Sequence, residues 1–208
     1  MATKSAKLRL VFSSGNPDKF KEVSQILSAA WLEVVPLSNF PGAPIPQEGT
    51  DSVKENALIK ARVARKFTGL PSIGDDTGLE VEMLDGKPGV FSSRYAGADA
   101  SYEDNVKKLL EALQSFPKEQ RTARFTCIVA LALPDGREKL FRGYCRGHIA
   151  LEPNGEGGFG YDPVFVPEGR KSTFAQLSPQ MKNKMSHRGR AIRSLKRYLR
   201  KTHLVEET

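Results

Sequence analysis

Two adjacent carboxylates lie in the segment Gly74-Asp75-Asp76-Thr77-Gly78, at the end of a short predicted strand that begins at Leu70. Adjacent carboxylates repel each other unless a cation or a hydrogen-bond donor compensates their charge. Proteins bind magnesium through one or two carboxylates together with substrate phosphates and water. The pair therefore predicts either a Mg²⁺ site that serves phosphate chemistry or a polar turn whose acids are solvated.

A second polar cluster, Ser14-Gly15-Asn16-Pro17-Asp18-Lys19, follows a predicted strand and opens a predicted helix. Asn16 is a good N-cap, and Pro17 suits the first helical position. A helix start attracts anions through its N–H groups and dipole, Gly15 allows close approach, and Lys19 adds a positive charge. The spacing is not that of a Walker A loop. The cluster predicts an anion site or, alternatively, a plain strand-to-helix turn.

Two further segments carry side chains that could contact an aromatic ligand. Gly157-Gly158-Phe159-Gly160-Tyr161-Asp162-Pro163 interleaves rings with glycine, so its rings could stack on a base or could fill the core. Ser186-His187-Arg188-Gly189-Arg190 places an imidazole beside a guanidinium at a predicted helix start. A capped helix with a solvated basic side would show the same pattern.

Helices and strands are mixed among the elements that must position these residues. The predicted strands cover residues 7–13, 32–35, 70–75 and 79–83, with a hairpin of 123–133 and 139–146 around Pro134-Asp135-Gly136. The predicted helices cover 17–27, 53–67 behind the capping box Ser52–Glu55, and 101–113, with two more starting at Ser178 and Ser186. These elements predict one α/β domain over residues 1–208, with a mixed sheet and a central cleft.

The composition is that of an ordinary globular protein. Of 208 residues, 39% are apolar and 27% are charged, and no run approaches the roughly 18 apolar residues that cross a membrane. Cys127 and Cys145 lie in apolar runs and are expected to be buried thiols in a reducing environment. We therefore expect a cytoplasmic protein with no membrane partner.

The net charge of +8 has a local origin. Nine of the 32 Lys and Arg residues fall between Lys182 and His203, where there is no acid, and the rest of the chain holds 23 bases against 24 acids. Such a patch suits a triphosphate as well as it suits nucleic acid. An RNA-binding module that uses the basic C-terminal helix is one alternative. It is disfavoured because Ile192, Leu195 and Leu199 make that helix amphipathic first of all.

Six segments, in order along residues 11–191, resemble the inosine triphosphate pyrophosphatase family, whose members remove aberrant purine nucleoside triphosphates. The resemblance implies an elongated mixed sheet with flanking helices, two lobes around a central cleft, and a homodimer. The six segments are SGNPDKFKEV, KENALIKA, GDDTGLEV, GKPGVFSSRYAG, GGFGYDPVF and SHRGRA.

The resemblance also implies a role for each matching residue. Asp76 would bind Mg²⁺ and activate water, with Asp75 beside it and Glu48 as a second metal ligand, although the segment QEGTDSVKEN departs from the usual family order. Thr77 would contact the substrate and stands where the family often has Ser. The phosphate-binding group would be Ser14, Gly15, Asn16, Pro17, Asp18, Lys19 and Lys60. The base-binding group would be Phe159, Gly160, Tyr161, Asp162, Lys182, His187 and Arg188.

These roles predict the Mg²⁺-dependent hydrolysis of ITP, dITP and XTP to the monophosphate and pyrophosphate, without a stable nucleic-acid partner. Water would attack the α-phosphorus, and donors aimed at the 6-oxo group would select the base. A related pyrophosphatase for modified pyrimidine triphosphates is the alternative within the same chemistry. The pattern GFGYDP followed by SHR argues against it.

Overall fold

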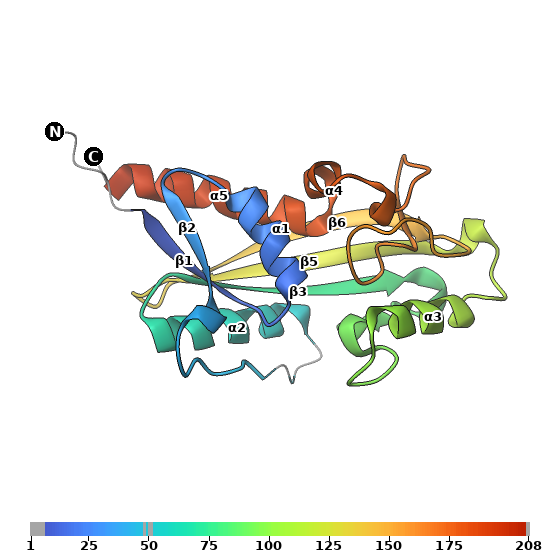
Figure 1. Ribbon diagram of the computed structural model, residues 1–208, viewed down its shortest axis with the longest axis horizontal. Coiled ribbons are helices and arrows are strands. Elements are labelled where there is room, and N and C mark those ends of the chain that lie inside the picture. Colours follow the sequence, from blue (N-terminus) through green and yellow to red (C-terminus); the bar gives the residue numbers. More distant parts are fainter. Residues whose placement is uncertain (1–6, 48, 50–51, 207–208) are drawn as a thin grey trace. The chain divides into compact units, whose positions relative to one another are not determined.

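The computed structural model describes residues 7–47, 49 and 52–206, and it has a mixed α/β architecture, as predicted. The helices are α1 (Pro17–Leu27), α2 (Val53–Thr68), α3 (Tyr102–Ala112), α4 (Pro179–Met185) and α5 (His187–Glu206) (Figure 1). The strands are β1 (Leu8–Ser13), β2 (Leu32–Pro36), β3 (Ser72–Val81), β4 (Pro88–Gly89), β5 (Thr122–Ala132), β6 (Glu138–Ile149) and β7 (Phe165–Pro167).

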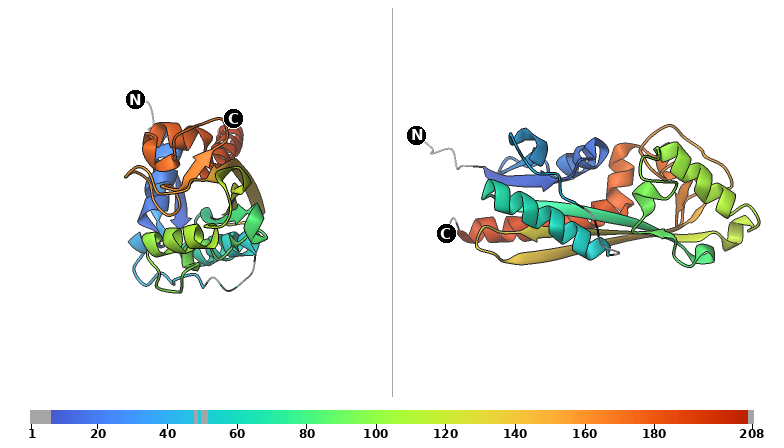
Figure 2. Two further views of the ribbon diagram at one scale, coloured as in Figure 1. Left: turned by 90° about the vertical axis from the view of Figure 1, so that its right-hand side faces the viewer. Right: turned by 90° about the horizontal axis from the view of Figure 1, so that it is seen from below.

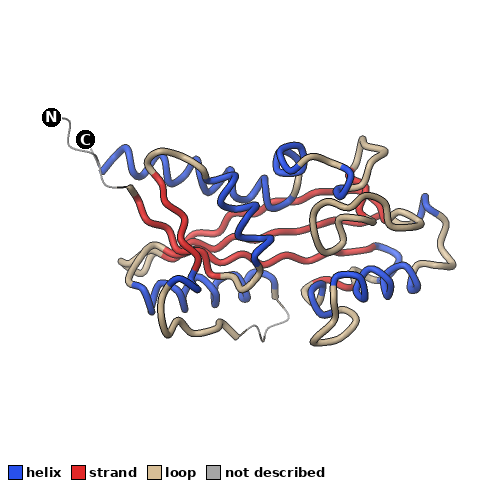
Figure 3. The backbone as a smooth tube through the Cα atoms, viewed as in Figure 1, coloured by secondary structure: helices blue, strands red, loops and turns tan. Residues whose placement is uncertain are grey.

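The strands form one sheet in the order β2-β1-β3-β5-β6-β7, with β4 paired to β3. Strand β1 runs parallel to β2 and β3, whereas β4 is antiparallel to β3 and β7 is antiparallel to β6. The predicted hairpin between β5 and β6 is confirmed, since the Leu133 N–H donates to the Arg137 carbonyl at 2.9 Å. The sheet is therefore mixed, as the sequence predicts. Figure 3 draws its strands in red.

Strand β3 corrects one prediction. The sequence predicts two strands, over 70–75 and 79–83, with a break at the Asp-Thr-Gly signal, but residues Ser72–Val81 form a single strand and Glu82–Leu84 form a 3₁₀ turn. Tertiary contacts of the polar side chains override their local turn preference. The neighbouring strand β1 ends beside the carboxylates, because its last residue, Ser13, pairs with Gly74 of β3.

The chain divides into two compact units, each with its own core. Unit 1 comprises Met1–Asp76, Ile128–Arg142 and Gly189–Thr208, and unit 2 comprises Thr77–Cys127 and Gly143–Arg188. The chain passes between them within β3, β5 and β6, and near the start of α5. The single domain and the central cleft expected from the sequence stay predictions.

In unit 1, helices cover both faces of the sheet. Neighbouring residues of a strand point to opposite faces, so Val11 packs with Ala64 of α2 while the Phe12 ring stacks on Phe20 of α1, with ring centroids 6.3 Å apart. Helices α2 and α5 also lie on opposite sides of these strands (Figure 2). This arrangement brings α1 and α2 to the two faces of β1 and of the β3 segment beside it.

Helix α5 has the predicted amphipathic character. Ile192, Leu195 and Leu199 are buried in the core. On the same helix, the Lys196 ammonium donates to the carbonyls of Ile26 and Ser28, each at 2.9 Å. These carbonyls lie at the C-terminal end of α1, where a cation is favourable. Part of the basic patch therefore serves the fold rather than an external polyanion.

In unit 2, α3 packs on one face of the sheet, and its Val106 and Leu109 join an aromatic core. The core rings of this cluster are Phe125, Tyr161, Phe165 and Phe174. Cys127 and Cys145 are buried free thiols, which confirms that prediction. Among the residues that the structure describes, no helix is both long enough and apolar enough to span a membrane.

Candidate active site

The first part of the site is the turn between β1 and α1. Asn16 caps the helix as predicted, and its side-chain oxygen accepts from the N–H groups of Asp18 at 2.9 Å and Lys19 at 3.1 Å. These two donors are therefore occupied within the turn. Gly15 is exposed, and the chain leaves open space where a side chain would begin. A ligand could approach the backbone there, beside the positive end of the helix dipole.

Two lysines compensate the adjacent carboxylates of β3. The Lys19 ammonium lies 3.3 Å from Asp75 Oδ1, and the Lys60 ammonium lies 3.0 Å from Asp76 Oδ1 and 3.0 Å from the Asp75 carbonyl oxygen. Asp75 is fully buried and Asp76 is 5% exposed. Buried carboxylates are costly without such partners. The sequence leaves open a Mg²⁺ site or solvated acids. In the structure each acid is buried and contacts one ammonium.

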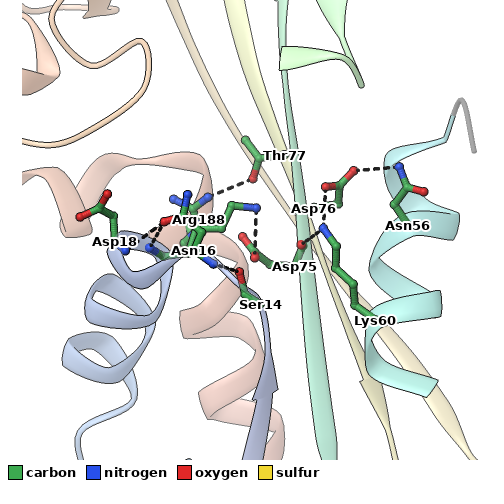
Figure 4. A network of polar contacts seen from close by, with 10 residues as sticks. Ser14, Asn16, Asp18, Asn56, Lys60, Asp75, Asp76, Thr77 and Arg188 are labelled. Atoms are coloured by element: carbon green, nitrogen blue, oxygen red, sulfur yellow. Dashed lines mark hydrogen bonds and ion pairs between the residues drawn. The ribbon is translucent and has the colours of Figure 1, made fainter. Parts of the chain in front are cut away.

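The two carboxylates leave β3 on opposite sides (Figure 4). Asp75 points toward Lys19 of α1, whereas Asp76 points toward Lys60 and Asn56 of α2. Strand alternation causes this separation. The family resemblance implies that Asp75 lies beside Asp76 at one metal ion. The opposite directions of the two side chains do not favour an ion that both of them bind.

Close packing of α2 on β3 brings Lys60 to the acids. A side chain at Gly74 would begin only 2.5 Å from the Ala57 carbonyl oxygen and 2.5 Å from the Lys60 β-carbon. Ala57 and Ala61 present small side chains on the same face of α2. These small side chains allow the close approach of α2 to β3. Any larger residue at position 74 would push α2 and its Lys60 away from Asp76.

Asn56 is a site residue that the sequence analysis missed. Its buried side-chain amide lies 3.5 Å from Asp76 Oδ2, one helical turn before Lys60. The spacing of four residues on a capped helix was the available signal. Among the described residues, no three His, Cys, Asp or Glu side chains cluster as a metal site. The expected ligand Glu48 lies outside those residues.

The second part of the site lies in unit 2, around the glycine-rich loop. The Asp162 carboxylate accepts from the Phe159 N–H at 2.7 Å and forms an ion pair with the buried Lys182 ammonium. That ammonium lies 4.6 Å from the centroid of the Phe159 ring. Gly158 has φ +74°, and a side chain on it would collide with Asp162. Asp162 thus holds both the loop backbone and the lysine.

The two aromatic rings of this loop differ in burial. Tyr161 is 5% exposed, and its hydroxyl donates to the Ser92 carbonyl at 2.9 Å. Burial raises the pKa of its phenol, which therefore stays protonated and keeps this donor. Phe159 is only partly buried. The loop follows both sequence alternatives, with one ring in the core and one at the surface.

His187 and Arg188 also differ. The His187 ring stacks on Phe125 of the unit 2 core, with centroids 4.4 Å apart and planes 17° apart. The Arg188 guanidinium donates to the Thr77 hydroxyl at 3.2 Å and lies 5.5 Å from the Phe159 ring centroid (Figure 4). Arg188 therefore joins Thr77 and Phe159 in one polar and aromatic cluster, together with Lys182. His187 lies against the hydrophobic core beside it.

The structure thus brings the predicted residues together in two groups. The phosphate-binding group and the acids lie in unit 1, and the base-binding group and Thr77 lie in unit 2. Gly160 of the base-binding group has φ +61°, a backbone conformation that favours glycine. Pro17 occupies the first turn of α1 as predicted.

This chain is similar to known proteins over most of its length. The sequence profile of the Ham1 family matches residues 10–198. A dITP/XTP pyrophosphatase of Geobacter sulfurreducens is 47% identical over 191 residues, which are 92% of this chain and 96% of that protein.

Solved structures give the same result. A HAM1 protein from Coxiella burnetii has a TM-score of 0.84 and 40% identity, and the match covers 93% of this chain and 99% of that one. A nucleoside-triphosphatase / dITP/XTP pyrophosphatase from Mycobacterium abscessus has a TM-score of 0.72 and 41% identity, with 90% and 98% covered. The resemblance inferred from six short segments is confirmed along nearly the whole chain.

Proposed function

The chain belongs to the Ham1 family, and from this premise we propose that it hydrolyses ITP, dITP and XTP to the monophosphate and pyrophosphate. The observation that carries the proposal is the nearly buried Asp76 carboxylate, held by Lys60 at 3.0 Å. It stands on β3 one residue after Asp75, which Lys19 of the α1 turn contacts. Carboxylate, ammonium and helix terminus together suit phosphate chemistry.

In the proposed reaction, water attacks the α-phosphorus and the bond from that phosphorus to the bridging oxygen of pyrophosphate breaks. Asp76 accepts the proton that the attacking water loses. Lys60 orients this carboxylate and offers positive charge to the phosphate oxygens, and Lys19 offers charge from the other side of β3. Catalysis is mainly positioning and charge neutralisation.

We also propose Mg²⁺ as the cofactor. Asp76 supplies a carboxylate, which the Asn56 amide N–H would orient by donating to its Oδ2. Mg²⁺ commonly takes one or two carboxylates and leaves its other positions to phosphate oxygens and water. When bound, the ion would neutralise charge on the substrate phosphates. Glu48 would add a second carboxylate, and Asp75 would serve Lys19 instead.

The base-binding group accounts for the choice of purine. Arg188 can only donate hydrogen bonds, so it fits the 6-oxo acceptor of hypoxanthine or xanthine and not the 6-amino donor of adenine. Phe159 offers a partly exposed ring for stacking. Lys182 is fixed by Asp162 next to that ring.

The test is a substrate panel with controlled metal. Protein treated with EDTA and titrated with Mg²⁺ should release pyrophosphate from ITP, dITP and XTP, and release it far more slowly from ATP and from modified pyrimidine triphosphates. Activity should rise from neutral to alkaline pH, because the attacking water must lose a proton. Orthophosphate as the product, or full activity without a divalent cation, would contradict the proposed reaction.

We further propose that the protein is a cytoplasmic homodimer. The family resemblance supports the dimer, and the two free buried thiols suit a reducing compartment. Light scattering of the purified protein should give about twice the 22.9 kDa mass of one chain. A mass of one chain across the micromolar range would rule the dimer out.

A further inference from the structure

Phe159 lies between two glycines of the glycine-rich loop. Its neighbours Gly158 and Gly160 have φ +74° and +61°, a region that suits glycine. Several hydrogen bonds hold the loop backbone: the Phe159 N–H donates to the Asp162 carboxylate, the Asp162 N–H donates to the Phe159 carbonyl, and the Gly157 N–H donates to the Ala175 carbonyl. These bonds fix the backbone, and none of them involves the ring. The orientation of the ring therefore depends on what contacts it.

Among the described residues, three side chains are recorded against the ring. The Lys182 ammonium is 4.6 Å and the Arg188 guanidinium carbon is 5.5 Å from the ring centroid, and the Tyr102 ring centroid is 5.8 Å away with planes 41° apart. Lys182 and Arg188 are the cations that face the base in the proposed function. Their contacts with the ring would change when a nucleotide binds. Tyr102 is outside every segment assigned to substrate binding.

Tyr102 is well placed to act as a fixed support. It is the first residue of α3, whose start is closed by a capping box in which Ser101 and Asp104 bond each other reciprocally. Asn105 ties the same turn to the Ala96 N–H at 2.8 Å and to the Ser93 carbonyl at 3.2 Å. The Tyr102 backbone is thus fixed, although its side chain is 40% exposed.

We propose that Tyr102 is a positioning residue, which holds the Phe159 ring in the orientation that stacks on the purine base. The inference rests on the proposed function, in which Phe159 is the stacking ring. Tilted aromatic pairs at this separation attract each other beyond their buried area. The pair joins a rigid helix start to a glycine-rich loop, so its loss would affect the loop rather than the helix.

The experiment compares Tyr102→Ala with Tyr102→Phe, using ITP as the substrate. Tyr102→Ala should raise KM about three- to tenfold, the range that an aromatic pair contributes, with kcat within about twofold. Tyr102→Phe keeps the ring and should match the wild type. Tyr144→Ala is the matched control, because Tyr144 is 41% exposed in the same unit and contacts Arg124 instead. It should leave KM unchanged.

A base-free probe separates positioning from general damage. Inorganic tripolyphosphate, used as a competitive inhibitor, lacks the base, so its inhibition constant should be the same for Tyr102→Ala and the wild type. An inhibition constant that rises in parallel with the KM for ITP would overturn the proposal. A Tyr102→Phe variant as impaired as Tyr102→Ala would also overturn it.

A double-mutant cycle with Phe159→Ala decides whether the effect passes through Phe159. Tyr102→Ala should raise the KM for ITP when Phe159 is present and should have no further effect when it is combined with Phe159→Ala. An equal effect in both backgrounds refutes the support role while the stacking role of Phe159 stands. If Phe159→Ala itself leaves the KM for ITP unchanged, the proposed base site is wrong, and the inference falls with it.

Discussion

Replacing Asp76 with Asn should lower pyrophosphate release from ITP on the order of a thousandfold, the range typical of losing a general base. Asn keeps the volume of Asp and still offers an oxygen to the Lys60 ammonium, which also retains the Asp75 carbonyl at 3.0 Å. It cannot accept the proton of the attacking water, and it binds Mg²⁺ more weakly. Pyrophosphate release and thermal melting should be measured on the same sample.

Asp75→Asn is the matched control, because it alters the neighbouring buried ion pair on the other side of β3. Both variants weaken one contact between a lysine and a carboxylate, so both should melt at a lower temperature. If lost stability explained inactivity, the two variants would lose turnover together. We expect Asp75→Asn to keep turnover that is readily measured. Turnover near that of the wild type in Asp76→Asn would remove Asp76 from the chemistry.

Local signals in the sequence were sufficient to predict the start of the phosphate-binding group. Asn16 followed by Pro17 predicts a capped helix after a strand, and both residues take those positions. These features depend only on residues that are close in the sequence, because an N-cap contacts backbone groups two or three residues away. The predicted helix boundaries of α1 hold for the same reason.

Contacts between distant segments could not be predicted in this way. Turn-forming residues at Asp76–Gly78 indicate a break in the strand, yet β3 continues through them. Their polar groups are satisfied by Lys60 of α2 and by Arg188, which is 111 residues further along the chain. Local propensity carries no information about such partners. The missed Asn56 belongs to the same class, since its role depends on how α2 packs at Gly74.

The base-binding group shows the same limit at the level of single side chains. The sequence places two rings in one loop and two basic groups at one helix start, and it leaves open which of them are buried in the core. In the structure Tyr161 and His187 pack in the hydrophobic core of unit 2, while Arg188, which is also buried, contacts the partly buried Phe159 ring. Only packing shows which contacts each of them makes, because local sequence carries no information about distant partners.

Because Arg188 contacts Phe159 whereas His187 stacks on the core, we expect Arg188 to set base selectivity. Arg188→Ala should lower kcat/KM for ITP about ten- to a hundredfold and change kcat/KM for ATP little. A hydrogen bond from a charged donor contributes about 1.5–3 kcal/mol, which corresponds to that range. ATP should be spared because its 6-amino group offers no acceptor to a guanidinium. The measurement is the ITP/ATP ratio of kcat/KM in the wild type and the variant.

Two further variants show whether the effect belongs to the base. Lys19→Ala should lower kcat/KM for both nucleotides about equally, because both carry the same triphosphate and Lys19 lies at the α1 turn beside Asp75. Arg190→Ala removes an exposed charge two residues along the same helix and should change neither value. An unchanged ITP/ATP ratio in Arg188→Ala, or a ratio that collapses only in Lys19→Ala, would mean that the base is read elsewhere. The contact of Arg188 with Thr77 would then be structural, like the stacking of His187 on Phe125.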